Sequence, residues 1–239
     1  MPSDELDDRA LDLVLEVEEQ LESNPLGALQ IAEHAPPESA MHPEVRLARA
    51  RALLAARGAK EARPWLSDLV AAEPEFAEAR HVLAAVLEEL GDHAGSVREF
   101  LVVRRLDQAS DEADGFELAA AEKLIVETAE RVVRDLPERF QKLIGVVPIL
   151  VEDRPSEALV REGFDPRSLG LFDGPDHAER AGGSVPAPTR IVLYAANLCA
   201  YADPSDAEEL AREVEVTVLH EIGHYFGLDE GELDALGLA

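Results

Sequence analysis

Residues 216–239 read VTVLHEIGHYFGLDEGELDALGLA and carry His220 and His224 four positions apart, with Glu221 directly after the first histidine. Residues four apart on an α-helix lie on the same face, so both imidazoles would project to one side. Two such imidazoles can bind one Zn²⁺ ion, which in catalytic sites has three protein ligands and a water molecule. Glu221 would stand beside this water and accept its proton during attack on a carbonyl. The stretch therefore predicts a hydrolytic zinc site with His220 and His224 as ligands and Glu221 as general base.

The residues that precede and include the histidines are predicted to form one long helix. Ser205 or Asp206 can cap its N-terminus, and the acidic residues that follow suit the positive end of the helix dipole. Gly227 can end the helix in a left-handed turn. Apolar residues at three- and four-residue steps predict a core-facing stripe, formed by Val214, Val218, Ile222 and Tyr225.

A third ligand is expected among the acidic residues that follow Gly227. The stretch resembles the extended zinc-peptidase pattern H-E-x-x-H-x-x-G-x-x-ligand, in which the third ligand falls at Glu230. Gly227 would let the chain reverse so that Glu230 reaches the ion. Asp229 is the next candidate, followed by Glu232 and Asp234, and the choice among these four acids stays open.

Two known clans of zinc peptidases differ from this sequence. Metzincins have His or Asp where this chain has Glu230, and they carry a methionine in a later turn, whereas Met1 and Met41 are the only methionines here. Gluzincins use a glutamate as third ligand, but it lies on a later helix that is usually much further along the chain. The sequence therefore belongs with neither clan in its standard form.

The second half of the chain predicts a small domain of mixed helix and strand, residues 116–239. The acidic stretch DQASDEADG, residues 107–115, lacks apolar periodicity and is the expected domain boundary. Helices are expected over 116–136 and 137–144, and a strand within 145–155. Residues 163–188 are expected to be loop-like with one short apolar piece, LGLFDGP, and a strand is expected over 191–194, with helix as an alternative for the residues after it. The strand in RIVLY is expected at a sheet edge, where it could pair with an extended peptide substrate.

The first half of the chain predicts an all-α domain, residues 1–110, so the fold class is α+β overall. Residues 5–107 are rich in Ala, Leu, Glu and Arg with helical apolar spacing. Gly58 and Gly91 lie 33 residues apart, and Pro25 lies another 33 before Gly58. This spacing resembles that of tetratricopeptide repeats, whose period is about 34 residues. Such repeats would bind a protein partner, or would only stabilise the neighbouring domain. Trp65 is expected to lie in the core of these helices.

The overall charge excludes two classes of partner. The chain has 50 acidic and 22 basic residues and a net charge of -28, which repels nucleic-acid phosphates and anionic membrane surfaces. No stretch has the roughly 20 apolar residues of a membrane span, and MPSDELDD lacks the features of a secretory signal. A cytoplasmic location is therefore expected.

The single cysteine, Cys199, suits a reducing compartment and is expected to be buried and inert.

The segment from about Leu118 to Leu238 resembles a family of short bacterial zincin-like metallopeptidases, sometimes grouped with minimal zincins. The resemblance rests on LPERFQKLIGVVPILVEDRP, LGLFDG, RIVLY and above all EVTVLHEIGHYFGLDEGELDALG. It implies a compact helix-sheet-helix domain with zinc on the active-site helix, His220 and His224 as ligands and Glu221 as general base. It implies no particular substrate and does not cover residues 1–110.

Two functions follow from these features. The first is a zinc-dependent peptidase that uses Glu221 as base on a metal-activated water, with the helical repeats recruiting a protein partner or substrate. The second is a protein-interaction scaffold in which the zincin-like domain is stabilised by metal but has little or no activity.

Tyr194 could donate a hydrogen bond to an oxyanion, but its side chain is expected to pack in the core instead. His177 is a lone histidine that is expected outside the metal site. The oligomeric state is left open by the sequence.

Overall fold

The computed structural model describes residues 8–114, 118–144, 147–175 and 190–238. The chain divides by its internal contacts into two compact units, which are described separately below. The first contains Met1–Ser110 and Glu157–Gly163, and the second contains Asp111–Ser156 and Phe164–Ala239. In the described ranges, no helix is both long enough and apolar enough to cross a membrane.

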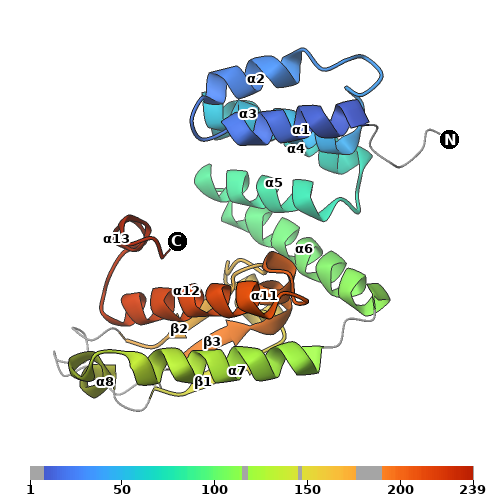
Figure 1. Cartoon of the computed structure of the whole chain (residues 1–239). Helices are drawn as coiled ribbons and strands as arrows, with labels where there is room; N and C mark the ends of the chain where they lie inside the picture. The colour runs from blue at the N-terminus through green and yellow to red at the C-terminus, as the bar shows by residue number, and fades with distance from the viewer. Residues whose placement is uncertain (1–7, 115–117, 145–146, 176–189, 239) are drawn as a thin grey trace. The chain divides into compact units, whose positions relative to one another are not determined.

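The first unit consists of helices that follow one another along the chain (Figure 1). Consecutive helices from α1 to α5 pack against each other, and small side chains such as Ala48, Ala52 and Ala62 let them approach closely. Its helices are α1 (Asp8–Gln20), α2 (Pro25–Glu33), α3 (Pro43–Arg57), α4 (Ala59–Ala72), α5 (Ala77–Glu89) and α6 (His93–Asp114), which continues into the second unit; α9 (Glu157–Arg161) also belongs here.

The two glycines of the predicted repeat lie in equivalent turns. Gly58 separates α3 from α4 with a φ of 86°, and Gly91 lies between α5 and α6 with a φ of 76°. Both values are in the left-handed region, where glycine has no steric penalty. Asn24 caps α2 after the turn from α1. The tetratricopeptide-like repeat, and with it membership of that family, stays a prediction.

Trp65 lies at the surface, and the prediction that it belongs to the core is wrong. Its side chain on α4 is 47% exposed, and the guanidinium carbon of Arg49 lies 4.2 Å from the ring centroid. The buried positions of α4 are taken instead by smaller apolar residues, among them Leu66 and Leu69. The apolar spacing around Trp65 indicated a helix correctly but did not show which side of the helix faces the core.

The second unit contains a three-stranded mixed sheet in the order β1-β3-β2. β3 (Arg190–Tyr194) is the central strand; it pairs in parallel with β1 (Ile149–Glu152), with Ile149 opposite Ile191. It pairs antiparallel with β2 (Gly170–Asp173), with Gly170 opposite Leu193.

Two sequence-based expectations about this sheet are wrong. The strand in RIVLY is central rather than at an edge, as its continuous burial over residues 191–194 requires, because both of its faces are covered. β2 lies within residues 163–188, which the sequence predicts as loop-like with one short apolar piece, LGLFDGP. Its four residues are too few to show strand periodicity in the sequence.

Helices α7 (Leu118–Asp135) and α12 (Ala207–Tyr225) lie side by side over the sheet (Figure 1). α7 contacts β1, whereas α12 contacts β2 and β3. The predicted stripe of α12 is confirmed, because Val214, Val218, Ile222 and Tyr225 are all buried in the core. Residues of α7 at helical spacing, including Ile125 and Ala129, complete this core.

The second unit also contains the shorter helices α8 and α11. α8 (Glu138–Ile144) follows α7 after Pro137, as expected from the sequence, and α11 (Ala195–Tyr201) continues directly from β3. Cys199 on α11 is buried as expected, and burial, followed by the charge of Asp111, raises the pKa of its thiol to about 11. This thiol is therefore protonated and inert at neutral pH.

Candidate metal centre

The ends of α12 determine how its two histidines are presented. Asp206 caps the N-terminus by accepting hydrogen bonds from the backbone N–H groups of Glu208 and Glu209, at 3.0 and 3.1 Å. At the other end Gly227 has a φ of 80°, and the N–H of Leu228 donates to the carbonyl of Gly223 at 3.1 Å. This left-handed turn ends the helix and reverses the chain, as the sequence predicted.

After the reversal, the short helix α13 (Glu230–Ala235) returns against α12. Leu233 of α13 is fully buried, and a Cβ atom placed on Gly223 would lie only 2.3 Å from its Cδ2 atom. The missing side chain at Gly223 therefore makes room for Leu233. This contact holds α13 close to the histidine face of α12.

The two histidine side chains meet at their Nε2 atoms. The rings of His220 and His224 have centroids 4.6 Å apart, and their Nε2 atoms are separated by 2.9 Å. Nδ1 of His220 donates to the carbonyl oxygen of Leu238 at 2.6 Å, and Nδ1 of His224 donates to that of Leu228 at 3.1 Å. A carbonyl oxygen can only accept, so each Nδ1 donates a proton, and this leaves Nε2 as the nitrogen that can offer a lone pair to a metal.

Glu230 brings a carboxylate to the same point. Its Oε1 lies 3.3 Å from Nε2 of His224, and its Oε2 lies 3.6 Å from Nε2 of His220, while its side chain is 74% exposed. Among the described residues, His220, His224 and Glu230 form the group of possible ligands that could hold one metal ion. The structure therefore brings together the two histidines and the first of the four acids considered from the sequence.

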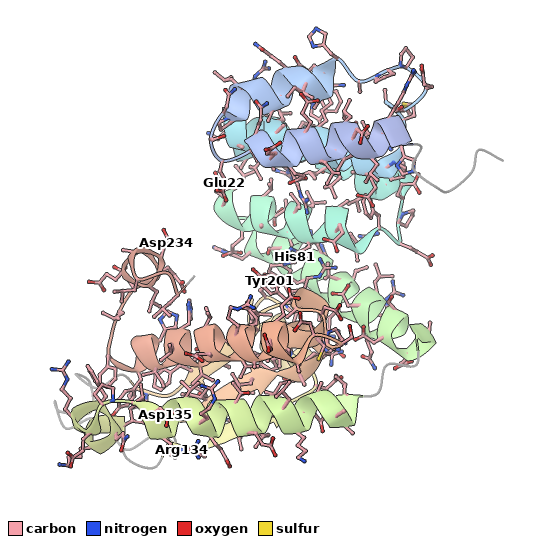
Figure 2. The ribbon with its side chains drawn as sticks, viewed as in Figure 1. Glu22, His81, Arg134, Asp135, Tyr201 and Asp234 are labelled. Atoms are coloured by element: carbon pink, nitrogen blue, oxygen red, sulfur yellow. The ribbon has the colours of Figure 1, made fainter. Side chains whose placement is uncertain are left out.

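The other three acids lie in different environments. Asp229 is the N-cap of α13 and accepts from the backbone N–H of Glu232 at 2.9 Å, while Glu232 accepts from that of Asp229 at 3.0 Å. This reciprocal capping box occupies both carboxylates and stabilises the first turn of α13. Asp234 is exposed on α13 and points away from α12 (Figure 2).

Glu221 lies beneath this group and is almost completely buried, with 6% of its surface exposed. The backbone N–H of Phe172 on β2 donates a hydrogen bond to its carboxylate. Burial raises the pKa of Glu221 above its ordinary value, although the two neighbouring histidines and the Phe172 N–H act in the opposite direction. A Cβ atom on Gly170 would lie 2.9 Å from Oε1 of Glu221, so the glycine lets β2 approach this carboxylate.

An open pocket of about 330 Å³ gives access to these groups. One wall is the side of α12 that carries His220, Glu221 and His224, and the other is β2 with the residues just before it. The full lining consists of Phe164, Ser168, Leu169, Gly170, Leu171, Phe172, Glu213, Val216, Thr217, His220, Glu221, His224, Glu230 and Leu238. The pocket is therefore bounded mainly by α12 and the edge strand β2, and Glu230 of α13 and Leu238 complete its lining.

Other residues singled out in the sequence do not join this group. Tyr194 is buried at the end of β3, and burial, followed by the charges of Glu152 and Glu221, raises the pKa of its hydroxyl. It is absent from the pocket lining, in agreement with a packing role. His177 lies outside the described residues.

Several parts of the site were not found from the sequence. The backbone carbonyls of Leu228 and Leu238 orient the two histidines. Every residue has a backbone carbonyl, so the sequence does not indicate which carbonyls accept these hydrogen bonds. Gly170 and Gly223 are visible in the sequence, and a glycine in a strand or helix interior does indicate close approach by another group. Which group approaches can be read only from the fold.

Residues 144–238 match the family model described as Zincin-like metallopeptidase. This match covers the sheet, α12 and α13, and it lies outside helices α1 to α7. No curated protein matches the chain. Residues 144–238 are thus similar to zincin-like metallopeptidases, a family whose members typically bind zinc.

The geometry of the three side chains fits a zinc ion. Ligand atoms about 2.0 to 2.1 Å from a tetrahedral ion stand about 3.3 Å from one another. The two Nε2 atoms here are 2.9 Å apart, and the two oxygens of Glu230 lie 3.3 Å from Nε2 of His224 and 3.6 Å from Nε2 of His220. Two Nε2 lone pairs facing each other also repel unless a proton or cation lies between them. The hydrogen bonds at both Nδ1 atoms hold the rings in the orientation that a metal requires.

If Glu230 is the third ligand, Glu230→Ala will weaken zinc binding by about 100-fold or more while Asp234→Ala leaves it unchanged. Loss of one of three protein ligands removes a metal bond, whereas Asp234 belongs to the same helix and carries the same charge. Competition with a chromophoric chelator measures the zinc dissociation constant of each variant. Equal constants for Glu230→Ala and the wild-type protein would exclude Glu230 as a ligand.

Proposed function

We propose that the protein is a zinc-dependent peptidase. The observation that carries this proposal is the convergence of His220, His224 and Glu230 on one point, beside the buried carboxylate of Glu221 in an open pocket. The match to the zincin-like metallopeptidase family supports the same reaction class. A cytoplasmic location stays a prediction from the sequence.

His220, His224 and Glu230 would hold the zinc ion. When bound, zinc supplies Lewis-acid chemistry: it polarises a carbonyl group and makes a water molecule more acidic. The neutral imidazoles donate through Nε2, because Leu238 and Leu228 accept the Nδ1 protons. All three residues line the pocket, so an ion held by them would be accessible from it.

Glu221 is proposed as the general base. Its carboxylate accepts a proton from the attacking water and then delivers this proton to the leaving amine, so the scissile amide nitrogen departs as a neutral group. Burial favours the neutral carboxyl that Glu221 forms after it has accepted the proton and before it delivers it. The backbone N–H of Phe172 keeps the side chain in place. The close approach of Gly170 limits the room in which Glu221 can rotate.

The edge of β2 is proposed to bind the substrate backbone. β2 pairs with β3 on one side, and no other strand of the described residues pairs with its second side. An extended peptide can add to such an edge as a further strand, with its amide groups hydrogen-bonded to those of β2. The residues of β2 line the pocket opposite Glu221, so this arrangement would bring the scissile bond to the proposed base.

A Glu221→Gln variant is expected to retain zinc and lose about 10²- to 10⁴-fold in peptide cleavage, because the amide has the same shape but cannot accept the proton. Glu215→Gln is the matched control, since Glu215 lies on the same helix and forms an exposed ion pair with Arg131 at 3.2 Å. Zinc content and cleavage of a quenched peptide library are measured on the purified proteins.

Two results would contradict this proposal. If Glu221→Gln retains full activity, Glu221 is not the base. If the wild-type protein binds zinc and cleaves neither library peptides nor unfolded protein, the domain is a metal-stabilised scaffold rather than a peptidase.

The helical unit is proposed to recruit the protein substrate. Exposed Trp65 lines a pocket of about 360 Å³ in this unit, together with the basic residues Arg49, Arg57 and Lys60 and the acidic residues Glu33 and Glu61. Large aromatic residues beside arginine are typical anchors of protein interfaces. In a chain of net charge -28, a pocket with three basic and two acidic residues suits a segment of a protein substrate that carries acidic and apolar side chains better than the rest of the surface does.

Trp65→Ala is expected to lower kcat/KM for an unfolded acidic protein such as casein by about tenfold, as loss of an aromatic anchor does. Cleavage of a short peptide should not change, because a short peptide does not need this surface. Leu26→Ala is the control, since Leu26 is also exposed, at 62%, and lies outside the Trp65 pocket. Equal casein cleavage by wild type and Trp65→Ala would exclude recruitment through this surface.

A further inference from the structure

Glu213 is the acidic residue of the pocket that has no part in the proposed reaction. It lies on α12 and lines the same pocket as His220, Glu221 and His224. Residues 213, 217, 220, 221 and 224 recur at three- and four-residue steps, so they share one face of the helix. Glu213 therefore faces the space in which a substrate would lie.

The carboxylate of Glu213 is free of specific partners within the described structure. No hydrogen bond or ion pair joins it to a described residue, although the charge of the adjacent Arg212 acts on it. By contrast, Glu215 of the same helix pairs with Arg131, and Asp206 caps the helix N-terminus. Glu213 is also partly buried, and this burial raises the pKa of its carboxyl.

No positively charged residue faces Glu213 from the pocket. The lining contains Glu213, Glu221 and Glu230 but no Lys or Arg among the residues described. In the proposed reaction, Glu230 is a metal ligand and Glu221 moves the proton. Glu213 therefore remains as a partly buried acidic group that no Lys or Arg of the described pocket lining neutralises, and a cation from the substrate would lower its free energy.

The position of Glu213 limits which substrate residue can reach it. Seven residues of α-helix separate it from His220, which corresponds to about 10 Å along the helix axis. An extended peptide lying along β2 covers this distance in about three residues. Apolar residues of the pocket, including Phe164, Leu169 and Val216, offer surface for the aliphatic part of a long basic side chain.

We propose that Glu213 is a specificity-determining residue that selects peptides with Lys or Arg within about three residues of the cleaved bond. The ammonium or guanidinium group pairs with the Glu213 carboxylate, while the substrate backbone lies along β2. This inference rests on the proposed peptidase function and adds its substrate class. It differs from a general effect of the acidic surface, because one carboxylate carries the preference.

The test uses pairs of quenched peptides that differ at one position, with lysine in one and the uncharged acetyl-lysine in the other. The position is varied over three residues on each side of the cleaved bond. The wild-type protein should favour lysine at one of these positions by about fivefold in kcat/KM, as expected for a partly exposed ion pair. Glu213→Gln should abolish the preference, and Glu213→Asp should retain part of it.

Glu215→Gln is the matched control, because it removes the same charge from the same helix but outside the pocket. It should keep the full preference for lysine. The proposal is overturned if the wild-type protein cleaves both members of every pair equally, or if the preference survives in Glu213→Gln. A preference lost equally in Glu213→Gln and Glu215→Gln would assign it to overall charge and would also overturn the proposal.

A binding measurement separates this inference from the peptidase proposal. Fluorescence anisotropy of the labelled lysine peptide is measured with the Glu221→Gln variant, with and without Glu213→Gln, in the presence of zinc. Loss of the Glu213 carboxylate should raise the dissociation constant about fivefold, whether or not the wild-type protein cleaves the peptide. Equal dissociation constants would overturn the role of Glu213 even if peptide cleavage is confirmed.

Discussion

The packing of Leu233 against the bare backbone of Gly223 is the contact on which the site depends. It holds α13 against the end of α12, and α13 carries Glu230 to the two histidines. Any side chain at position 223 would have to displace a fully buried leucine. Because ligand atoms must lie within a few tenths of an ångström of their places to bind zinc, the proposed metal centre is expected to be sensitive to this packing.

The segment after α12 contributes to the site mainly through its backbone. Carbonyl groups of Leu228 and Leu238 accept the Nδ1 protons of the two histidines, and the capping box of Asp229 and Glu232 begins the helix that carries Glu230. Glu221 depends on the opposite wall, where β2 supplies the Phe172 N–H and the space beside Gly170. The proposed catalytic and ligand groups are thus each held by a neighbouring element rather than by α12 alone.

The parts that could be predicted from the sequence are those encoded by local pattern. The limits and buried stripe of α12 follow from its cap, its apolar spacing and Gly227, and the histidine spacing alone brings His220 and His224 together. The order of the sheet could not be predicted, because four-residue strands show no period and pairing is a long-range property. The outward orientation of Trp65 was missed because a large aromatic at helical spacing suits either side of a helix.

Zinc-edge X-ray absorption of the purified, zinc-loaded protein tests most directly whether His220, His224 and Glu230 share one ion. Two imidazole nitrogens and additional oxygen donors at about 2.0 to 2.1 Å are expected, with no sulfur in the coordination shell. A shell with fewer than two imidazoles, or one made of oxygen alone, would contradict the site on which the proposed function rests.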